Sequence, residues 1–164
     1  MGTGYHGGFG NTYGVASGDA VFPSDPQSFF SYIAKRSDID KNGVYDVVAH
    51  GGSTFILVTH NGKTLSIDSR TAAKLIKSKS EYKAGRPIRL LSCDTGSSIS
   101  GFAQNLANKL GVVVEAPTKT LWAYTNGKYL VAARRKKRPD LPDLNNRGKF
   151  KKFYPGGKNR CTIL

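Results

Sequence analysis

Short apolar runs alternate with amphipathic helical patterns through the middle of the chain. The runs fall at residues 44–49, 87–91 and 112–114, and their short, mostly apolar character is typical of buried strands. Two of the segments between or beside them, residues 69–76 and 100–110, space their apolar side chains for one helical face. Strands that alternate with helices predict an α/β domain with a mostly parallel central sheet and helices on both faces.

Capping and turn residues mark the ends of several predicted elements. Ser24-Asp25-Pro26 predicts the start of an earlier helix, residues 68–69 can cap a later one, and Gly111 is suited to close the last. Asn61-Gly62 and Asn126-Gly127 each lie between apolar runs. Because both residues of this dipeptide tolerate positive φ, the pattern is a strong hairpin signal. We therefore expect two β-hairpins beside the central sheet.

Positive charge is concentrated toward the C-terminus. The chain has 25 Lys and Arg against 11 Asp and Glu, for a net charge of +14. The apolar pattern fades after Ala133, so we expect a catalytic domain over residues 1–133 and a basic tail over residues 134–164. Such a tail favours a polyanionic partner, and we expect an anionic membrane rather than nucleic acid. The predicted membrane-binding residues are Arg134, Arg135, Lys136, Lys137, Arg138, Lys149, Lys151, Lys152, Lys158 and Arg160.

Candidate chemistry lies where two of the predicted buried strands end. Cys93 follows one strand, and of the three histidines only His50 ends another. A thiol attacks as its thiolate, and an imidazole can remove the thiol proton near neutral pH. Since functional sites lie beyond the carboxyl ends of parallel strands, we predict Cys93 as nucleophile and His50 as its acid/base partner.

Two glycines follow His50 and let a substrate approach the backbone. The backbone amides of Gly51, Gly52 and Cys93 are candidate donors to a developing oxyanion. The histidines and cysteines have no ligand-like spacing, so no metal site is predicted.

Two sequence blocks carry a resemblance to a known class of peptidase. Residues 45–51, Tyr-Asp-Val-Val-Ala-His-Gly, and residues 88–94, Ile-Arg-Leu-Leu-Ser-Cys-Asp, resemble the paired signatures of caspase-like (clan CD) cysteine peptidases. Their spacing is most similar to that of the autoprocessing peptidase domains of large bacterial toxins. The resemblance, which covers about residues 44–115, implies a caspase-like fold, a Cys–His dyad, an oxyanion site at Gly51 and Cys93, and peptide-bond cleavage.

The resemblance also implies an acidic group that orients the histidine and an inositol hexakisphosphate cofactor. Asp46 lies on the same face as His50 in strand period, and Asp19 and Asp25 are alternatives. The autoprocessing toxins hold inositol hexakisphosphate in a basic pocket. No residue of this chain can be matched to that pocket, so we do not expect the cofactor to be required.

Three further stretches are similar to the variable C-terminal toxin domains of Rhs-repeat proteins and insecticidal toxin complexes. They are residues 102–107, 116–118 and 153–157. The similarity implies a toxin domain that a parent Rhs-type protein delivers.

Asp94-Thr95-Gly96-Ser97 matches the aspartic-protease signature. That chemistry needs two such aspartates that share a proton, and the chain has one copy. The segment that follows also predicts a helix, so we favour the cysteine chemistry.

The last four residues, Cys161-Thr162-Ile163-Leu164, fit the C-a-a-X prenylation pattern with a terminal Leu that indicates geranylgeranyl. One lipid chain holds a membrane only marginally, and an upstream basic patch supplies the second signal. We therefore expect lipidation at Cys161 inside a eukaryotic host and action at a host membrane.

The leading hypothesis is a secreted bacterial toxin domain, delivered into the host cytosol, that cleaves a host protein as a Cys–His peptidase. The alternatives are a Cys–His deamidase, transglutaminase or acyltransferase, and a non-enzymatic module that binds an anionic membrane or nucleic acid.

Overall fold

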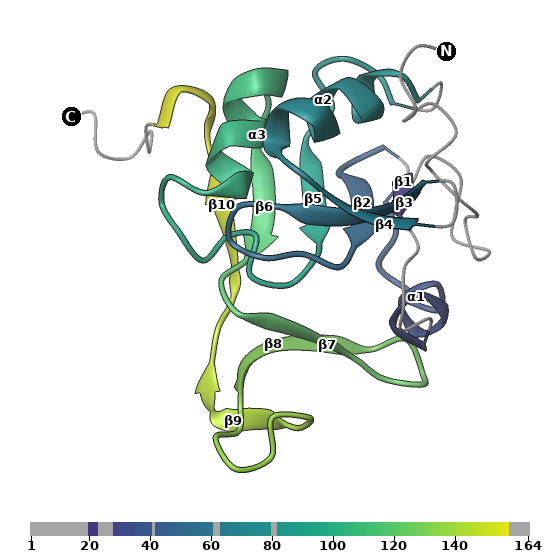
Figure 1. Cartoon of the computed structure of the whole chain (residues 1–164). Coiled ribbons are helices and arrows are strands. Elements are labelled where there is room, and N and C mark those ends of the chain that lie inside the picture. Colours follow the sequence, from purple (N-terminus) through teal and green to yellow (C-terminus); the bar gives the residue numbers. More distant parts are fainter. Residues whose placement is uncertain (1–19, 23–27, 41, 61–62, 80–81, 158–164) are drawn as a thin grey trace.

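In the computed structural model of the protein, the residues described are 20–22, 28–40, 42–60, 63–79 and 82–157. A five-stranded sheet in the order β1-β2-β5-β6-β10 forms its centre (Figure 1). The first four strands are parallel to their neighbours, and β10 is antiparallel to β6. The predicted α/β class is confirmed, and the central sheet is partly parallel. The strands are β1 (Ala20–Phe22), β2 (Tyr45–Ala49), β5 (Ile88–Leu91), β6 (Val114–Pro117) and β10 (Phe150–Phe153).

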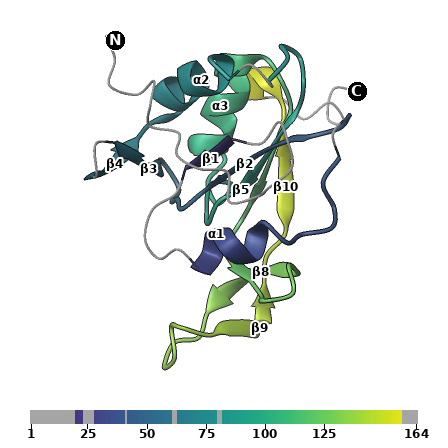
Figure 2. The same ribbon diagram turned by 90° about the vertical axis from the view of Figure 1, so that its right-hand side faces the viewer.

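One face of the sheet is covered by α2 (Ser69–Lys77) and α3 (Phe102–Leu110), as the two views of Figure 1 and Figure 2 show. Both helices bury one apolar face in the larger core cluster, which also contains alternate residues of the strands. The hairpin of β3 (Ile56–His60) and β4 (Lys63–Ile67) contributes to the same cluster. Two of the predicted caps are confirmed, because the Asp68 side chain accepts from the Thr71 amide and Gly111 adopts a φ of 68°. The helix start predicted at Ser24-Asp25-Pro26 lies outside the described residues.

The opposite face carries a three-stranded antiparallel sheet and the short helix α1 (Ser28–Ile33). Val48 and Leu91 of the central sheet pack on this side in a second apolar cluster. The prediction that helices cover both faces is not confirmed. The layer on this face consists mostly of strands, with one helix of 6 residues. Its strands are β7 (Thr120–Ala123), β8 (Tyr129–Arg134) and β9 (Pro142–Arg147).

The two predicted hairpins are present. β3 and β4 pair antiparallel out to His60 and Lys63, and β7 pairs antiparallel with β8. Gly127 closes the second turn with a φ of 87°, and a Cβ there would stand 2.3 Å from the Lys35 carbonyl oxygen. This position therefore requires glycine both for its backbone conformation and for its close approach.

The predicted basic tail is not confirmed. β10 pairs with β6 inside the central sheet, from Phe150↔Pro117 to Phe153↔Val114, and η1 (Pro155–Gly157) follows it. Phe153 is buried while Lys151 and Lys152 are exposed. Because β10 is an edge strand that carries exposed lysines, its sequence does not show the apolar pattern by which a strand is predicted. The apolar pattern that fades after Ala133 thus does not mark the end of the folded core. Within the described residues, no helix is long and apolar enough to cross a membrane.

Candidate active site

Strands β2 and β5 are parallel neighbours that bring His50 and Cys93 to the same edge of the sheet. Their register ends with Val48↔Leu91, and His50 and Cys93 each stand two residues further along. Neighbouring strands lie about 4.8 Å apart, so the two backbones are adjacent where the strands end. Strand parity directs both side chains to the face of Val48 and Leu91, toward α1 and β7.

His50 and Cys93 line one cavity of about 560 Å³. The exposed residues Arg134 and Asp140 also line it and form its rim. The cavity is large enough to hold a substrate side chain beside both reactive groups. Much of its wall is aromatic or apolar and comes from α1 and β7: Phe29, Tyr32, Leu121, Trp122 and Ala123.

The Cys93 thiol is held by the backbone of Leu121. The Leu121 N–H donates to Sγ at 3.3 Å, and the thiol donates to the Leu121 carbonyl oxygen at 3.7 Å. Burial raises the pKa of the Cys93 thiol and outweighs the lowering effects of the Leu121 amide and Arg134, while Asp94 adds to the rise. The resting group is therefore a neutral thiol, which needs a base at the moment of attack.

The outer edge of β7 faces the end of β5. The amide of Asp94 donates to the Lys119 carbonyl oxygen at 3.0 Å, and Leu121 contacts Cys93 through both its backbone groups. Along an edge strand, the N–H and C=O groups that point away from the paired strand belong to every second residue. The backbone groups of Ala123 therefore point to the same side of β7 as those of Leu121. Lys119 and Leu121 are engaged by the end of β5, so Ala123, which lines the cavity, is the residue of this edge that can pair with an extended peptide.

The imidazole of His50 is packed against two rings of α1. Its centroid lies 5.2 Å from that of Phe29 and 4.9 Å from that of Phe30 in an edge-on arrangement. The His50 carbonyl oxygen accepts from the Leu57 amide at 2.9 Å, which fixes the backbone where β2 leaves the sheet. Helix α1 therefore helps to orient the ring that faces the cavity.

The two glycines after His50 differ in what their backbones do. The Gly52 amide donates to the Phe55 carbonyl oxygen at 3.0 Å, so its predicted role as an oxyanion donor is not supported. A Cβ at Gly51 would stand 2.3 Å from the Ser92 hydroxyl oxygen. The turn after His50 therefore lies directly against the residue before Cys93, and Gly51 stays the predicted oxyanion donor.

Asp46 does not orient His50, which corrects the prediction. Its buried carboxylate accepts from Arg89 through both oxygens, at 2.8 and 2.7 Å, and from Arg36 at 3.0 and 2.8 Å. Residues four apart on a strand are separated by about 13 Å, beyond the reach of a direct contact with the imidazole. Strand parity put Asp46 on the right face but at the opposite end of β2 from His50.

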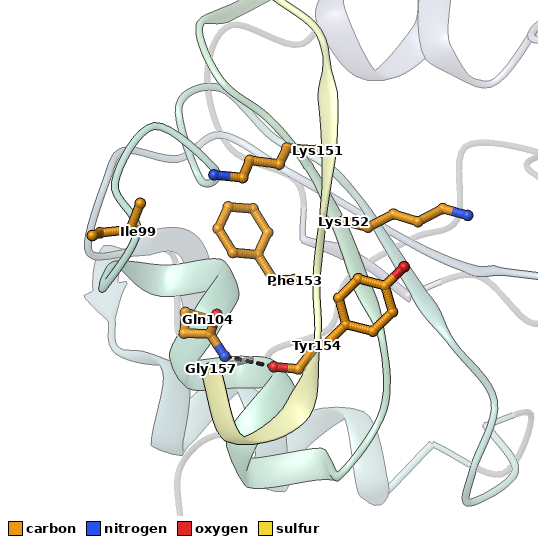
Figure 3. Close-up of a pocket in the computed structure, with 7 residues that line it drawn as sticks. All are labelled: Ile99, Gln104, Lys151, Lys152, Phe153, Tyr154 and Gly157. Carbon is orange, nitrogen blue, oxygen red and sulfur yellow. Dashed lines mark hydrogen bonds between the residues drawn. The ribbon is translucent and has the colours of Figure 1, made fainter. Parts of the chain in front are cut away.

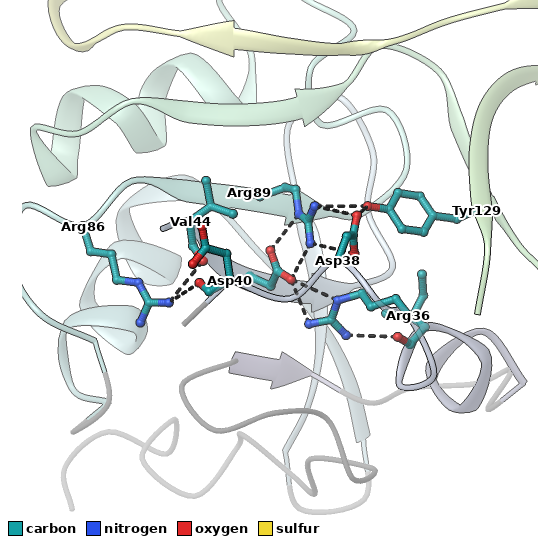
Figure 4. Close-up of polar contacts among 9 residues, drawn as sticks. Arg36, Asp38, Asp40, Val44, Arg86, Arg89 and Tyr129 are labelled. Carbon is teal, nitrogen blue, oxygen red and sulfur yellow. Dashed lines mark hydrogen bonds and ion pairs between the residues drawn. The ribbon is translucent and has the colours of Figure 1, made fainter. Parts of the chain in front are cut away.

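The same ion network ties the central sheet to β8. Arg89 also contacts Asp38, and the Tyr129 hydroxyl donates to Asp38 (Figure 4). Burial would raise the pKa of Asp38, but the Tyr129 hydroxyl and Arg89 outweigh it and hold the pKa below its usual value. Burial and the Asp38 carboxylate raise the pKa of Tyr129. These contacts fix β8, and hence its partner β7, over the end of β5.

Asp94 follows Cys93 directly and shapes the site, a role that the aspartic-protease-like Asp-Thr-Gly-Ser run does not predict. It is the non-glycine residue with positive φ, at 59°, among those described. This left-handed turn directly after Cys93 directs the chain away from the sheet and toward α3. Burial raises the pKa of Asp94 against the opposing effects of Arg134 and Lys119. The Ser-Cys-Asp-Thr-Gly run was the available signal, since a short polar side chain tolerates this conformation.

The basic residues predicted to contact a membrane lie in two places. Arg134 to Arg138 end β8 and begin the connection to β9 beside the cavity, whereas Lys149, Lys151 and Lys152 precede or lie on β10. Lys151 and Lys152 line a separate cavity of about 150 Å³ together with Tyr154 (Figure 3). Two lysines balance only a fraction of the charge of a hexakisphosphate, so this cavity does not fit inositol hexakisphosphate.

Several predicted residues lie outside the described part of the chain. They are the alternative orienting acids Asp19 and Asp25, the basic residues Lys158 and Arg160, and the lipidation residue Cys161. Among the described residues, no group of three or more His, Cys, Asp or Glu side chains could hold a metal ion.

A family model covers the part of the chain that contains both reactive residues. Residues 19–131 match the family described as a domain of unknown function (DUF8616). The chain belongs to this family. No curated protein and no solved structure matches the chain. The DUF8616 match spans the strands that carry His50 and Cys93 and all of β7, and it ends before the basic connection between β8 and β9.

Proposed function

We propose that this DUF8616 chain is a cysteine peptidase domain in which Cys93 is the nucleophile and His50 the general base and acid. The observation that supports it is the shared cavity, which both residues line at the carboxyl ends of neighbouring parallel strands. The resemblance of residues 45–51 and 88–94 to caspase-like peptidases adds support from the sequence.

In this mechanism His50 removes the thiol proton as Cys93 Sγ attacks the scissile carbonyl carbon. The thiol gives up its contact with the Leu121 carbonyl oxygen, while the Leu121 N–H continues to donate to sulfur and stabilises the thiolate. The Gly51 amide is the proposed donor to the oxyanion. The protonated imidazole then donates to the leaving amine, and water attacks the thioester to release the acid and restore the thiol.

We also propose that the domain is a toxin that its parent protein delivers into a host cell. The three stretches that resemble toxin C-terminal domains contribute α3, the end of β6 and the β10–η1 segment. These elements pack on one another, and Gln104 donates to the Tyr154 carbonyl oxygen at 2.8 Å (Figure 3). The resemblance therefore coincides with one packed unit, formed by the β6–β10 side of the central sheet with α3 and η1, which supports homology of that unit rather than scattered identities.

The test is digestion of a proteome-derived peptide library by the purified chain, with intact-mass analysis of the products. We expect the wild-type chain to cut peptides, and Cys93→Ala and His50→Ala to lower the rate at least about a hundredfold. Cys161→Ala, at the other cysteine, is the matched control and should retain full activity.

Cutting that persists in a folded Cys93→Ala chain would exclude the peptidase. A mass change of about one dalton without chain cleavage would instead indicate deamidation by the same Cys–His pair. In host cells, toxicity should likewise be lost in Cys93→Ala. Loss of toxicity in a Cys161→Ala chain that still cuts peptides would indicate that lipidation at Cys161 is required for action at a host membrane.

A further inference from the structure

The connection between β8 and β9 concentrates positive charge at the mouth of the candidate active site. Residues 134–140, here called the basic loop, contain five Lys or Arg residues and one acid, Asp140. Both ends of the basic loop line the cavity, at Arg134 and Asp140. The loop between them is exposed, so its cations stand beside the opening through which a substrate reaches Cys93.

The basic loop is held in one shape by its own hydrogen bonds. The Arg135 amide donates to the Leu141 carbonyl oxygen at 3.0 Å, and the Leu141 amide donates to the Arg138 carbonyl oxygen at 2.9 Å. Arg134 Nη1 donates to the Pro139 carbonyl oxygen at 2.8 Å, and its guanidinium lies 5.4 Å from the ring centroid of Trp122 in the cavity wall. The charges are therefore presented in a fixed arrangement rather than on a flexible tail.

Acidic residues of the chain balance only part of this charge. Asp140 pairs with Arg138 at 3.1 Å, and both side chains are 64% exposed. Asp94 lies near Arg134 and Lys119, which both act on its carboxylate. These two acids face six cations, counting the five of the basic loop and Lys119. Lys136 and Lys137 extend from the middle of the loop and are exposed.

We propose that the basic loop binds acidic side chains of the substrate, so that the enzyme selects an extended, acidic peptide segment next to the bond it cuts. This inference rests on the proposed peptidase function. The main chain of β7 at Ala123 aligns the substrate main chain, and the loop recognises carboxylates that flank the residue held in the apolar cavity. Charge complementarity of this kind raises the association rate and is weakened by salt.

Lys136→Gln/Lys137→Gln is the variant that tests the inference, because it removes two exposed charges without altering the loop's internal hydrogen bonds. Lys151→Gln/Lys152→Gln removes the same charge from β10, beside the other cavity, and is the matched control. The probe is the proteome-derived peptide library, followed by kcat/KM for one cleaved acidic peptide and its Asp-to-Asn, Glu-to-Gln counterpart.

We expect wild-type cleavage sites to be enriched in Asp and Glu within a few residues of the cut. Lys136→Gln/Lys137→Gln should lower kcat/KM for the acidic peptide roughly three- to tenfold and leave that of the neutral counterpart unchanged. The control should leave both values unchanged, and added NaCl should reduce only the acidic peptide's value.

Cutting with no acidic preference, or with a preference that both variants keep, would overturn this inference and leave the peptidase in place. A library that the wild-type chain does not cut would overturn the peptidase and this inference with it. Vesicles of phosphatidylserine and phosphatidylcholine provide the last arm: loss of vesicle binding in Lys136→Gln/Lys137→Gln, with the peptide preference intact, would assign the basic loop to a membrane and overturn the proposal.

Discussion

At the scale of single residues, the site combines a reactive group with a backbone that only a few residue types can adopt. β5 ends at Leu91, and Cys93 lies two residues further along. Asp94, in the left-handed region, turns the chain directly after the thiol. The Asp94 amide is bound to the Lys119 carbonyl oxygen and the Asp94 carbonyl oxygen accepts from Ser97 Oγ, so the turn is fixed on both sides. The conformation of residue 94 is therefore part of how the nucleophile is presented.

Asp94→Val should destabilise the fold by about 1–2 kcal/mol, because a β-branched side chain is strained at positive φ. Asp94→Asn is the control and should be close to the wild type, since asparagine tolerates the left-handed region. Urea unfolding followed by fluorescence gives both values. Equal midpoints for the two variants would mean that residue 94 does not hold this conformation in solution.

At the scale of elements, the ends of β2 and β5 are packed so closely that residue 51 has no room for a side chain. The nearest obstacle to a Cβ at Gly51 is Ser92 Oγ, a buried atom with no hydrogen-bond partner among the described residues. Contact between the two turns, rather than strand pairing alone, then sets how close the His50 and Cys93 backbones come.

Gly51→Ala should cost about 1–3 kcal/mol of unfolding free energy because its methyl group collides with Ser92. Ser92→Ala removes the colliding oxygen, and Gly51→Ala/Ser92→Ala should recover much of the loss. A double-mutant cycle by urea denaturation measures this coupling. Additive costs would show that the two strand ends are not in contact.

The sequence predicts an element well where capping or turn residues mark its ends. It predicts an element poorly where the structure depends on pairing with a segment that is distant in the sequence. Gly111 and the Asn126-Gly127 turn are local signals, and the elements they end are present. β10 was missed because Lys151 and Lys152 make an edge strand look like a solvated tail, and only pairing with β6 reveals it. The convergence of His50 and Cys93 was predictable from strand order, since neighbouring parallel strands end at one edge.

At the scale of the whole molecule, one face of the central sheet carries polar groups at both ends of β2 and β5. Asp46 and Arg89 form an ion network at the beginning of β2 and β5, and His50 and Cys93 stand beyond the other end, with Val48 and Leu91 between. The partners of Asp46 come from separate parts of the chain, which is why strand period alone misassigned it. Its role is to hold the layers that carry the cavity.

Asp46→Asn should lower the unfolding free energy by about 3–5 kcal/mol, because it leaves two guanidinium groups without a full counter-charge in a buried site. Asp38→Asn, at the half-exposed end of the network, should cost about 1 kcal/mol or less. Molecules of Asp46→Asn that remain folded should keep the wild-type kcat. A stable Asp46→Asn enzyme with a greatly reduced kcat would instead restore Asp46 as the group that positions His50.

The central claim is that the His50 imidazole reaches the Cys93 sulfur, and alkylation kinetics test this without any knowledge of the substrate. The measurement is the rate constant for modification of Cys93 by iodoacetamide at pH 7, followed by mass spectrometry in a Cys161→Ser background. Because burial raises the pKa of this thiol, its reactivity at pH 7 depends on a neighbouring base. We predict that His50→Gln slows the reaction at least about tenfold, while His60→Gln leaves it unchanged. Equal rates in the wild type and a folded His50→Gln chain would contradict the account.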